Sequence, residues 1–307
     1  MDNISESMKQ WMDRNKQTEH YRQLMGEVYK NPDVLKFISD HKSELDEAHI
    51  DRSAAKLYEY VTEKQKLERG ETTFAPGYKP ELVISNHLVD VAYTPTEETL
   101  ERQRVKSEKR RVKSISMPKL VQTANLSEFD KDQNRVSALR EAMTFISNFE
   151  ASPKKYHQGL YLYGSFGVGK TYLLGAIANQ LAHDGFNTTL VHFPSFAVEM
   201  KNSISTNNVS EKLEAVKRSK ILMLDDIGAD TVSDWIRDEV LAVILEYRMQ
   251  EELPTFFSSN LSMERLEKEY LTVSKKSEAP LKAKRIMQRV RFLSKQIEMI
   301  GENRRPN

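Results

Sequence analysis

Hydrophobic residues in the first 70 positions recur at the three- and four-residue spacing of amphipathic helices. Gly70 follows the last of them and is typical of a helix stop, while Pro32 separates the first group from the second. The apolar positions are Leu24, Val28 and Tyr29, then Val34, Leu35, Phe37 and Ile38, then Ala55, Leu57, Tyr58 and Val61. The pattern predicts a small, mainly helical domain at this end of the chain.

Two short β-rich runs follow this helical region. They read LVIS (82–85) and LVDVAY (88–93), and only Asn86 and His87 lie between them. Alternating apolar residues around a two-residue polar connection are typical of a β-hairpin. We therefore expect a hairpin that closes the first domain, with His87 as a turn residue rather than a metal ligand.

From about Ser114 the pattern changes to strands that alternate with helices. Such alternation favours an α/β fold, in which right-handed crossovers build a parallel sheet. The predicted strands are YLY (161–163), TTLVHF (188–193), KILMLDD (220–226), PTFFSSN (254–260) and QIEMIG (296–301).

Composition narrows the class of protein. Charged residues make up 30% of the chain, and no apolar run approaches the length of a membrane span. The start, MDNISESMKQ, lacks the charged-then-apolar order of a secretory signal, so we expect a cytoplasmic protein that does not bind membranes. The absence of cysteine excludes disulfides, thiolate metal sites and cysteine nucleophiles.

The net charge of +1 is unevenly distributed. Residues 1–100 hold 19 acidic and 13 basic side chains, whereas residues 101–113 hold seven basic and two acidic ones. We therefore predict a domain over 1–100, a basic linker over 101–114 and a second domain over 115–307. The basic run is consistent with a solvated linker or helix face, and also with a contribution to nucleic-acid or partner binding.

The motif with the most specific chemistry is GSFGVGKT (164–171), which follows a predicted strand and opens a predicted helix. Its spacing fits G-x-x-x-x-G-K-[ST], a turn whose backbone N–H groups surround a phosphate chain. Lys170 would reach the β- and γ-phosphates of ATP, and the Thr171 hydroxyl would bind Mg²⁺. The alternative is a tight turn with a surface lysine. The predicted cofactor-binding residues here are Gly164, Ser165, Phe166, Gly167, Val168, Gly169, Lys170, Thr171 and Tyr172.

Polar residues end two of the predicted strands. ILMLDDIG (221–228) has four apolar residues before Asp225 and Asp226, which suits a buried strand that delivers acids to the carboxyl edge of a sheet. Asp225 would hold the hydration shell of Mg²⁺, and Asp226 would orient or deprotonate the attacking water. Asn260 ends the next strand and is either a γ-phosphate sensor or part of a helix cap.

Two further stretches are ambiguous. In LKAKRIMQRVRFL (281–293), Arg285 and Arg289 lie four apart on one helix face, which is consistent with a solvated stripe or with an arginine finger for a neighbouring subunit. In VHFPSFAVEMK (191–201), Phe193, Phe196 and Lys201 are consistent with stacking on single-stranded DNA or with an ordinary core.

Taken together, GSFGVGKT, ILMLDDIG, FFSSN and RIMQRVRF resemble, in order and distance, the AAA+ ATPases of the bacterial helicase-loader branch. The resemblance implies an ATP-dependent loader that places the hexameric replicative DNA helicase on single-stranded DNA during replication initiation and restart. It implies that residues 1–100 bind the helicase, and that the AAA+ domain is a weak ATPase that binds DNA and self-assembles.

The resemblance also assigns roles to individual residues. It implies Arg289 as the finger acting in trans, with Arg285 second, and Arg305 in GENRRPN as a sensor in cis. Some relatives look to carry a cysteine-rich zinc site in the first domain, but GETTFAPGYKPELV (70–83) has no cysteine, so we expect no zinc.

Other classes of ATPase share a similar core. A transposase-helper ATPase is the main alternative, and the separate acidic domain of about 100 residues favours a loader over it. A sequence-specific initiator would need a double-stranded DNA reader after the ATPase domain, and few residues remain after Gly301. A threading unfoldase would need an aromatic and glycine pore loop, which the sequence lacks.

Overall fold

The computed structural model describes residues 23–129, 133–272 and 279–303 of the chain. The chain divides into two compact units, Met1–Arg104 and Val105–Asn307, and the division falls inside helix α5 (Glu97–Arg111). In the described parts of both units, every helix is too short or too polar to cross a lipid bilayer.

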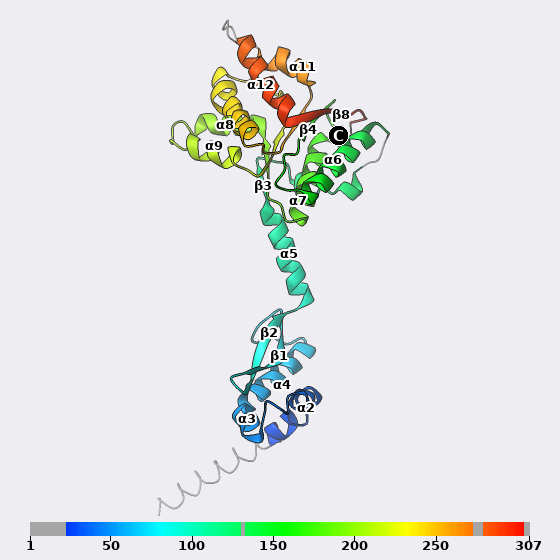
Figure 1. The fold of residues 1–307 in the computed structure, drawn as a ribbon, viewed down its shortest axis with the longest axis vertical. Coiled ribbons are helices and arrows are strands. Elements are labelled where there is room, and N and C mark those ends of the chain that lie inside the picture. The colour runs from blue at the N-terminus through cyan, green and yellow to red at the C-terminus, as the bar shows by residue number, and fades with distance from the viewer. Residues whose placement is uncertain (1–22, 130–132, 273–278, 304–307) are drawn as a thin grey trace, which may run out of the picture. The chain divides into compact units, whose positions relative to one another are not determined.

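The first unit combines short helices with one hairpin (Figure 1). Its described elements are a helix over 23–28, α2 (Pro32–Asp40), α3 (Glu47–Arg52), α4 (Ala54–Glu68), β1 (Tyr78–Ser85) and β2 (Leu88–Pro95). Val28, Val34, Leu57 and Val61 are buried together, which confirms the predicted helical core, whereas Leu35, Ala55 and Tyr58 are exposed. The Ser53 hydroxyl joins the start of α4 to the hairpin, because it accepts a hydrogen bond of 2.9 Å from the Val89 N–H.

The predicted hairpin is confirmed. β1 and β2 pair antiparallel from Tyr78 with Pro95 to Ser85 with Leu88. Asn86 and His87 make the turn with φ values of 51° and 61°, the left-handed conformation that a two-residue hairpin turn requires. His87 is therefore a turn residue, as the sequence indicated.

A buried carboxylate fastens the segment that leads from α4 to the hairpin. Glu63 accepts hydrogen bonds from the Phe74 N–H at 2.6 Å and from the Lys66 ammonium at 2.8 Å. The Lys66 and Phe74 hydrogen bonds lower the pKa of Glu63, so the side chain is a stable anion in this position. The bonds hold residues 70–77 against the helix.

The second unit is built on a six-stranded parallel sheet with the order β3-β5-β6-β7-β4-β8. Five strands confirm those predicted: β4 (Gly159–Tyr163), β5 (Thr188–His192), β6 (Ile221–Asp225), β7 (Thr255–Ser259) and β8 (Ser294–Glu298). The sixth, β3 (Val112–Ile115), was not predicted and lies at the sheet edge beside β5. It begins within residues 101–114, whose charge had indicated a linker, and residues 101–111 are helical in α5.

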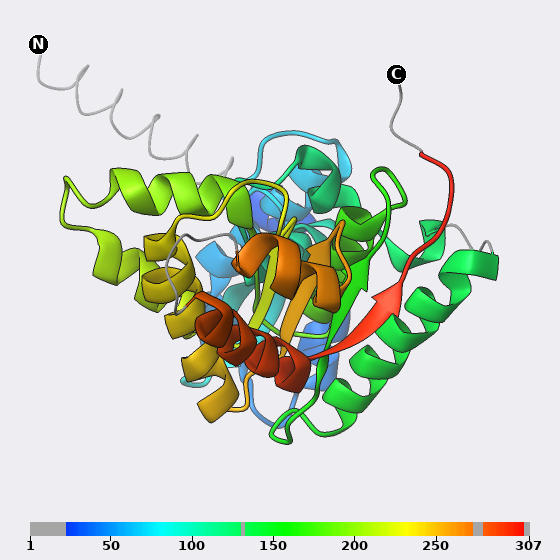
Figure 2. The same cartoon turned by 90° about the horizontal axis from the view of Figure 1, so that it is seen from above.

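Helices cover both faces of this sheet (Figure 2). One face packs against α6 (Gln133–Ala151), α7 (Lys170–His183) and the short segments η1 (Lys119–Thr123) and η2 (Leu126–Glu128). The other packs against α8 (Phe193–Asn202), α9 (Val209–Lys217), η3 (Ile236–Leu241), α10 (Ala242–Gln250), α11 (Met263–Arg265), η4 (Leu266–Leu271) and α12 (Ala279–Leu293). The central strands β6 and β7 are buried along their whole length, as their apolar sequences predicted.

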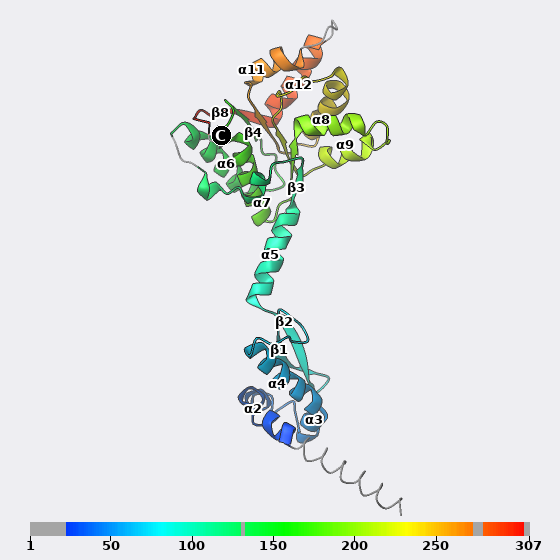
Figure 3. The same cartoon turned by 180° about the vertical axis from the view of Figure 1, so that it is seen from behind.

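Helix α8 follows β5 directly and lies beside α9 (Figure 3). Its first residues include Phe193 and Phe196, and each of these side chains is 1% exposed within the core of this face. They are core residues, which leaves them unable to stack on nucleic acid bases, whereas Lys201 on the same helix is exposed. The structure thus resolves the ambiguity of this stretch in favour of the core.

Because all six strands are parallel, their carboxyl ends lie along one edge of the sheet. The residues that follow β4, β6 and β7 along the chain are Gly164, Asp226 and Asn260, and β5 ends with His192. This edge therefore brings four separate segments to one place.

Candidate nucleotide-binding site

The turn between β4 and α7 has the backbone of a phosphate-binding loop. Gly169 has a φ of 97° and forms the N-cap of α7, and Gly164 has a φ of 151°. A Cβ on Gly164 would lie 2.0 Å from the Met299 carbonyl oxygen, so this position needs glycine both for its conformation and for space. The N-terminus of α7 points its backbone N–H groups toward the region in front of the turn.

Lys170 reaches across this turn. Its ammonium donates hydrogen bonds of 2.8 Å to the carbonyl oxygens of Gly164 and Ser165 and to the Asn260 Oδ1. The side chain is largely buried, so a cation is held in the turn beside the N-terminus of α7. This arrangement concentrates positive potential at the turn.

Thr171 and Asp225 meet at the base of the site. The Thr171 hydroxyl donates to both carboxylate oxygens of Asp225, at 2.9 and 3.1 Å, and the Ser258 hydroxyl donates to Asp225 Oδ1 as well. Burial raises the pKa of the Asp225 carboxyl, while the hydrogen bonds from Ser258 and Thr171 act in the opposite direction. A hydroxyl and a carboxylate in contact are the hard oxygen donors that Mg²⁺ prefers.

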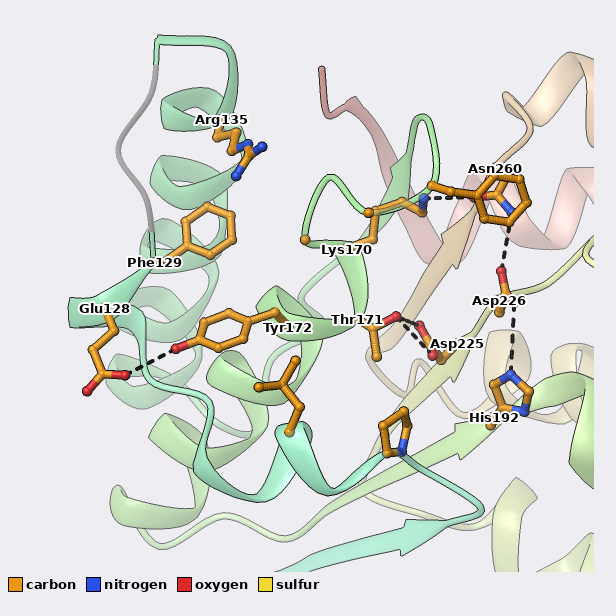
Figure 4. Close-up of a pocket in the computed structure, with 15 residues that line it drawn as sticks. Glu128, Phe129, Arg135, Lys170, Thr171, Tyr172, His192, Asp225, Asp226 and Asn260 are labelled. Atoms are coloured by element: carbon orange, nitrogen blue, oxygen red, sulfur yellow. Dashed lines mark hydrogen bonds and ion pairs between the residues drawn. The ribbon is translucent and has the colours of Figure 1, made fainter. Parts of the chain in front are cut away.

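A row of polar side chains runs along the edge of the sheet (Figure 4). Asn260 bonds to Lys170 through Oδ1 and makes a long hydrogen bond of 3.5 Å from Nδ2 to Asp226 Oδ1. On the other side of Asp226, His192 Nε2 lies 3.9 Å from Oδ2, and His192 Nδ1 contacts the Ser195 hydroxyl at 2.8 Å. Asp226 has a φ of 61°, a strained conformation of the kind that clusters at functional sites.

These residues line one pocket of about 570 Å³. Its lining includes Lys170, Asn260, Asp226 and His192 of this row, and it includes an aromatic pair, the rings of Phe129 and Tyr172 stacked at 6.2 Å. The remaining lining residues are Pro118, Leu120, Glu128, Arg135, Phe166, Gly167, Gly169, Thr171 and Asp225. Of the predicted loop residues, Gly164, Ser165 and Val168 are not part of this lining, and Val168 is buried in the core below the turn.

The sequence interpretation missed several of these lining residues. His192 ends a strand and follows the rule that identified Asp225 and Asn260, so the same signal was present in TTLVHF. Phe129 directly follows η2, and Arg135 lies on α6. No sequence motif marks either residue. They join the site only through the packing of α6 and α7.

Two of the predicted arginines, Arg285 and Arg289, are not among the described residues that line the pocket. Arg289 donates to the Ala242 carbonyl oxygen at 3.0 Å and pairs with Glu246 at 3.1 Å, both on α10. Arg285 lies on α12, the helix that also carries Arg289, and its side chain is exposed. Within the described residues it makes no hydrogen bond or ion pair. Arg305 lies outside the described residues.

Fold and site together define an ATP-binding protein of the AAA+ class, in which a parallel sheet carries a phosphate-binding turn and an acidic strand end. Two family models match the chain. Residues 1–93 match "Primosomal protein DnaI N-terminus", and residues 86–305 match "IstB-like ATP binding protein".

The chain is 36% identical to the replicative helicase loader DnaI of Bacillus subtilis (strain 168), over 92% of each chain. A crystal structure of DnaI is 44% identical, with a TM-score of 0.57, over 64% of this chain and 99% of that one. The replicative helicase loader DnaC of Escherichia coli (strain K12) is 24% identical over 44% of this chain and 54% of its own length. The chain belongs to the DnaI family of replicative helicase loaders.

Proposed function

We propose that this protein is an ATP-dependent loader of the hexameric replicative DNA helicase, which it places on single-stranded DNA during replication initiation and restart. One observation carries the proposal: a single chain joins a DnaI-type N-terminal region to a complete phosphate-binding edge. Residues 1–100 bind the helicase, residues 115–307 bind ATP and single-stranded DNA, and residues 101–114 connect them.

The site supports a slow, Mg²⁺-dependent hydrolysis of ATP. The turn from Gly164 to Gly169 surrounds the phosphates, Lys170 neutralises the β- and γ-phosphates, and Thr171 and Asp225 hold Mg²⁺. When bound, Mg²⁺ supplies positive charge against the phosphate oxygens. Asp226 orients the attacking water, and Asn260 contacts the γ-phosphate beside it.

The apolar end of the pocket is suited to the adenine base. The stacked rings of Phe129 and Tyr172 offer a flat apolar surface, and Leu120 also lines the pocket. The phosphates and the base therefore occupy opposite ends of one pocket.

None of the residues assigned so far places a guanidinium beside the charge that develops on the γ-phosphoryl group. We therefore propose that a neighbouring subunit supplies an arginine finger. The contacts of α12 favour Arg285 over Arg289 for this role, because Arg289 is bound to α10 of its own chain. Arg305 stays our candidate for a sensor in cis. Self-assembly through the AAA+ domain then completes each site.

A transposase-helper ATPase is the main alternative, since its core is similar. The match of residues 1–93 to the N-terminus of primosomal protein DnaI favours a loader, because it concerns the region in which the two classes differ.

The test is a loading assay with the helicase of the same organism, circular single-stranded DNA and ATP. We expect helicase retained on DNA with the parent protein and ATP, and much less with Lys170→Ala. The result that contradicts the proposal is equal loading with and without the protein, under conditions in which the protein and helicase are shown to be folded.

A further inference from the structure

The segment that follows β8 lies against the phosphate-binding turn. The Met299 N–H donates to the Tyr163 carbonyl oxygen at 2.7 Å, immediately before the turn. Its own carbonyl oxygen packs against Gly164, and the Asn303 side chain packs against Gly167, where an added Cβ would lie 1.8 Å from Asn303 Oδ1. Residues 299–303 therefore contact two glycines whose positive φ values shape the turn.

Arg135 on α6 holds this segment from the other side. Its side chain is 2% exposed and also lines the nucleotide pocket (Figure 4). Arg135 Nη2 donates to the Glu302 carbonyl oxygen at 3.3 Å. The guanidinium covers Gly301 so closely that an added Cβ would lie 2.4 Å from Nη2 and 2.8 Å from Nε.

We propose that Arg135 is a positioning residue that holds residues 299–303 against the phosphate-binding turn and thereby sets the affinity for the nucleotide. The role rests on the proposed function, because it concerns the same pocket. A turn that must keep its N–H groups directed at a phosphate binds best when its backbone is already ordered. The segment orders it through Gly164 and Gly167, and Arg135 orders the segment.

The geometry offers a matched pair of substitutions. Arg135→Gln removes the guanidinium, and Gly301→Ala places a methyl group where the guanidinium lies. Because the nearest atoms are the end of a flexible side chain, Gly301→Ala displaces Arg135 and leaves the backbone in place. The two substitutions therefore remove one interaction by different routes. Gly26→Ala is the control, since an added Cβ there meets nothing within 4 Å.

We expect Arg135→Gln and Gly301→Ala each to weaken binding of a fluorescent ATP analogue with Mg²⁺ by about tenfold, with kcat at saturating ATP changed less than about twofold. The double variant should be no weaker than either single one, because both remove the same contact. Arg135→Lys should recover part of the affinity. Circular dichroism and thermal unfolding identify any variant that fails to fold.

A second measurement separates positioning from direct contact with the nucleotide. Without nucleotide, the Met299 amide should exchange its hydrogen faster in Arg135→Gln than in the parent protein, because the bond to Tyr163 then opens more often. Unchanged exchange with weakened binding would mean that Arg135 contacts the nucleotide itself, and the proposal would be overturned. Additive losses in the double variant would overturn it too. If the parent protein fails to bind ATP, or Lys170→Ala binds as well as the parent, the proposed function fails instead.

Discussion

Asp225 and Asp226 are neighbours in the sequence but occupy different environments. Asp225 is 2% exposed and is held by two hydroxyl groups, whereas the Asp226 side chain is 31% exposed and faces the pocket between His192 and Asn260. Two carboxylates in such different surroundings suit different roles. Asp225 is fixed beside Thr171, and the half-buried Asp226 is open to the pocket.

At this scale we predict that Asp226→Asn retains ATP and loses turnover by at least about 100-fold, because an amide cannot accept the proton of the attacking water. Lys170→Ala should lose ATP binding instead, because the phosphate charge is then uncompensated. Equilibrium binding and phosphate release measure the two effects separately. Normal hydrolysis by both variants would contradict the assignment of the site.

How far single residues could be predicted depended on whether a local pattern marked them. The turn from Gly164 to Thr171 and the strand-end residues Asp225, Asp226 and Asn260 follow from spacing and strand polarity alone, and the structure brings them together. Phe129 and Arg135 enter the pocket through tertiary packing, which no short pattern encodes. Arg285 and Arg289 lie four positions apart, so the sequence places them on one face of α12. Only the packing of α10 shows that Arg289 is bound within its own chain.

At the scale of elements, substitutions in α12 test whether neighbouring subunits share the active site. We predict that Arg285→Ala binds ATP normally but fails to respond when subunits assemble on helicase or DNA. Arg289→Ala should keep that response and lose about 1 kcal/mol of stability, because it gives up its contacts with α10. Hydrolysis rates with and without assembly, and thermal unfolding, measure these effects.

Mixing variants makes the same test more specific. Arg285→Ala subunits mixed with Lys170→Ala subunits should recover part of the activity, because some interfaces then combine an intact turn with an intact arginine. If the mixture assembles and stays inactive, or if Arg289→Ala loses the response while folded, Arg285 is not the finger.

Elements were predictable where burial imposes a regular pattern. β6 and β7 are buried along their length and read as apolar runs, so both were predicted from the sequence. β3 has one neighbour, β5, and two exposed residues among its four, so its sequence VKSI resembles the charged segment before it. An edge strand of this kind is defined by the backbone of its neighbour rather than by its own side chains.

At the scale of the whole molecule, the two compact units predict a division of labour. Residues 1–104 contain their own buried core, so we expect this fragment to fold alone and to bind the helicase. Residues 1–100 have 19 acidic and 13 basic side chains, so added salt should weaken the binding in part. Circular dichroism and co-purification at low and high salt test this. Capture of the helicase by residues 105–307 alone would contradict the assignment of helicase binding to the first unit.

The position of β3 also determines where the ATPase unit can be cut. Its four residues cover one side of β5, from Thr188 to Val191. A fragment that starts at residue 115 loses three of these four residues and leaves the N–H and C=O groups of β5 open to strands from other molecules. Exposed strand edges of this kind promote aggregation. Insolubility of such a fragment would therefore reflect an unpaired edge of β5 and not a defect of the nucleotide site. A fragment that starts at residue 105 keeps β3 paired with β5.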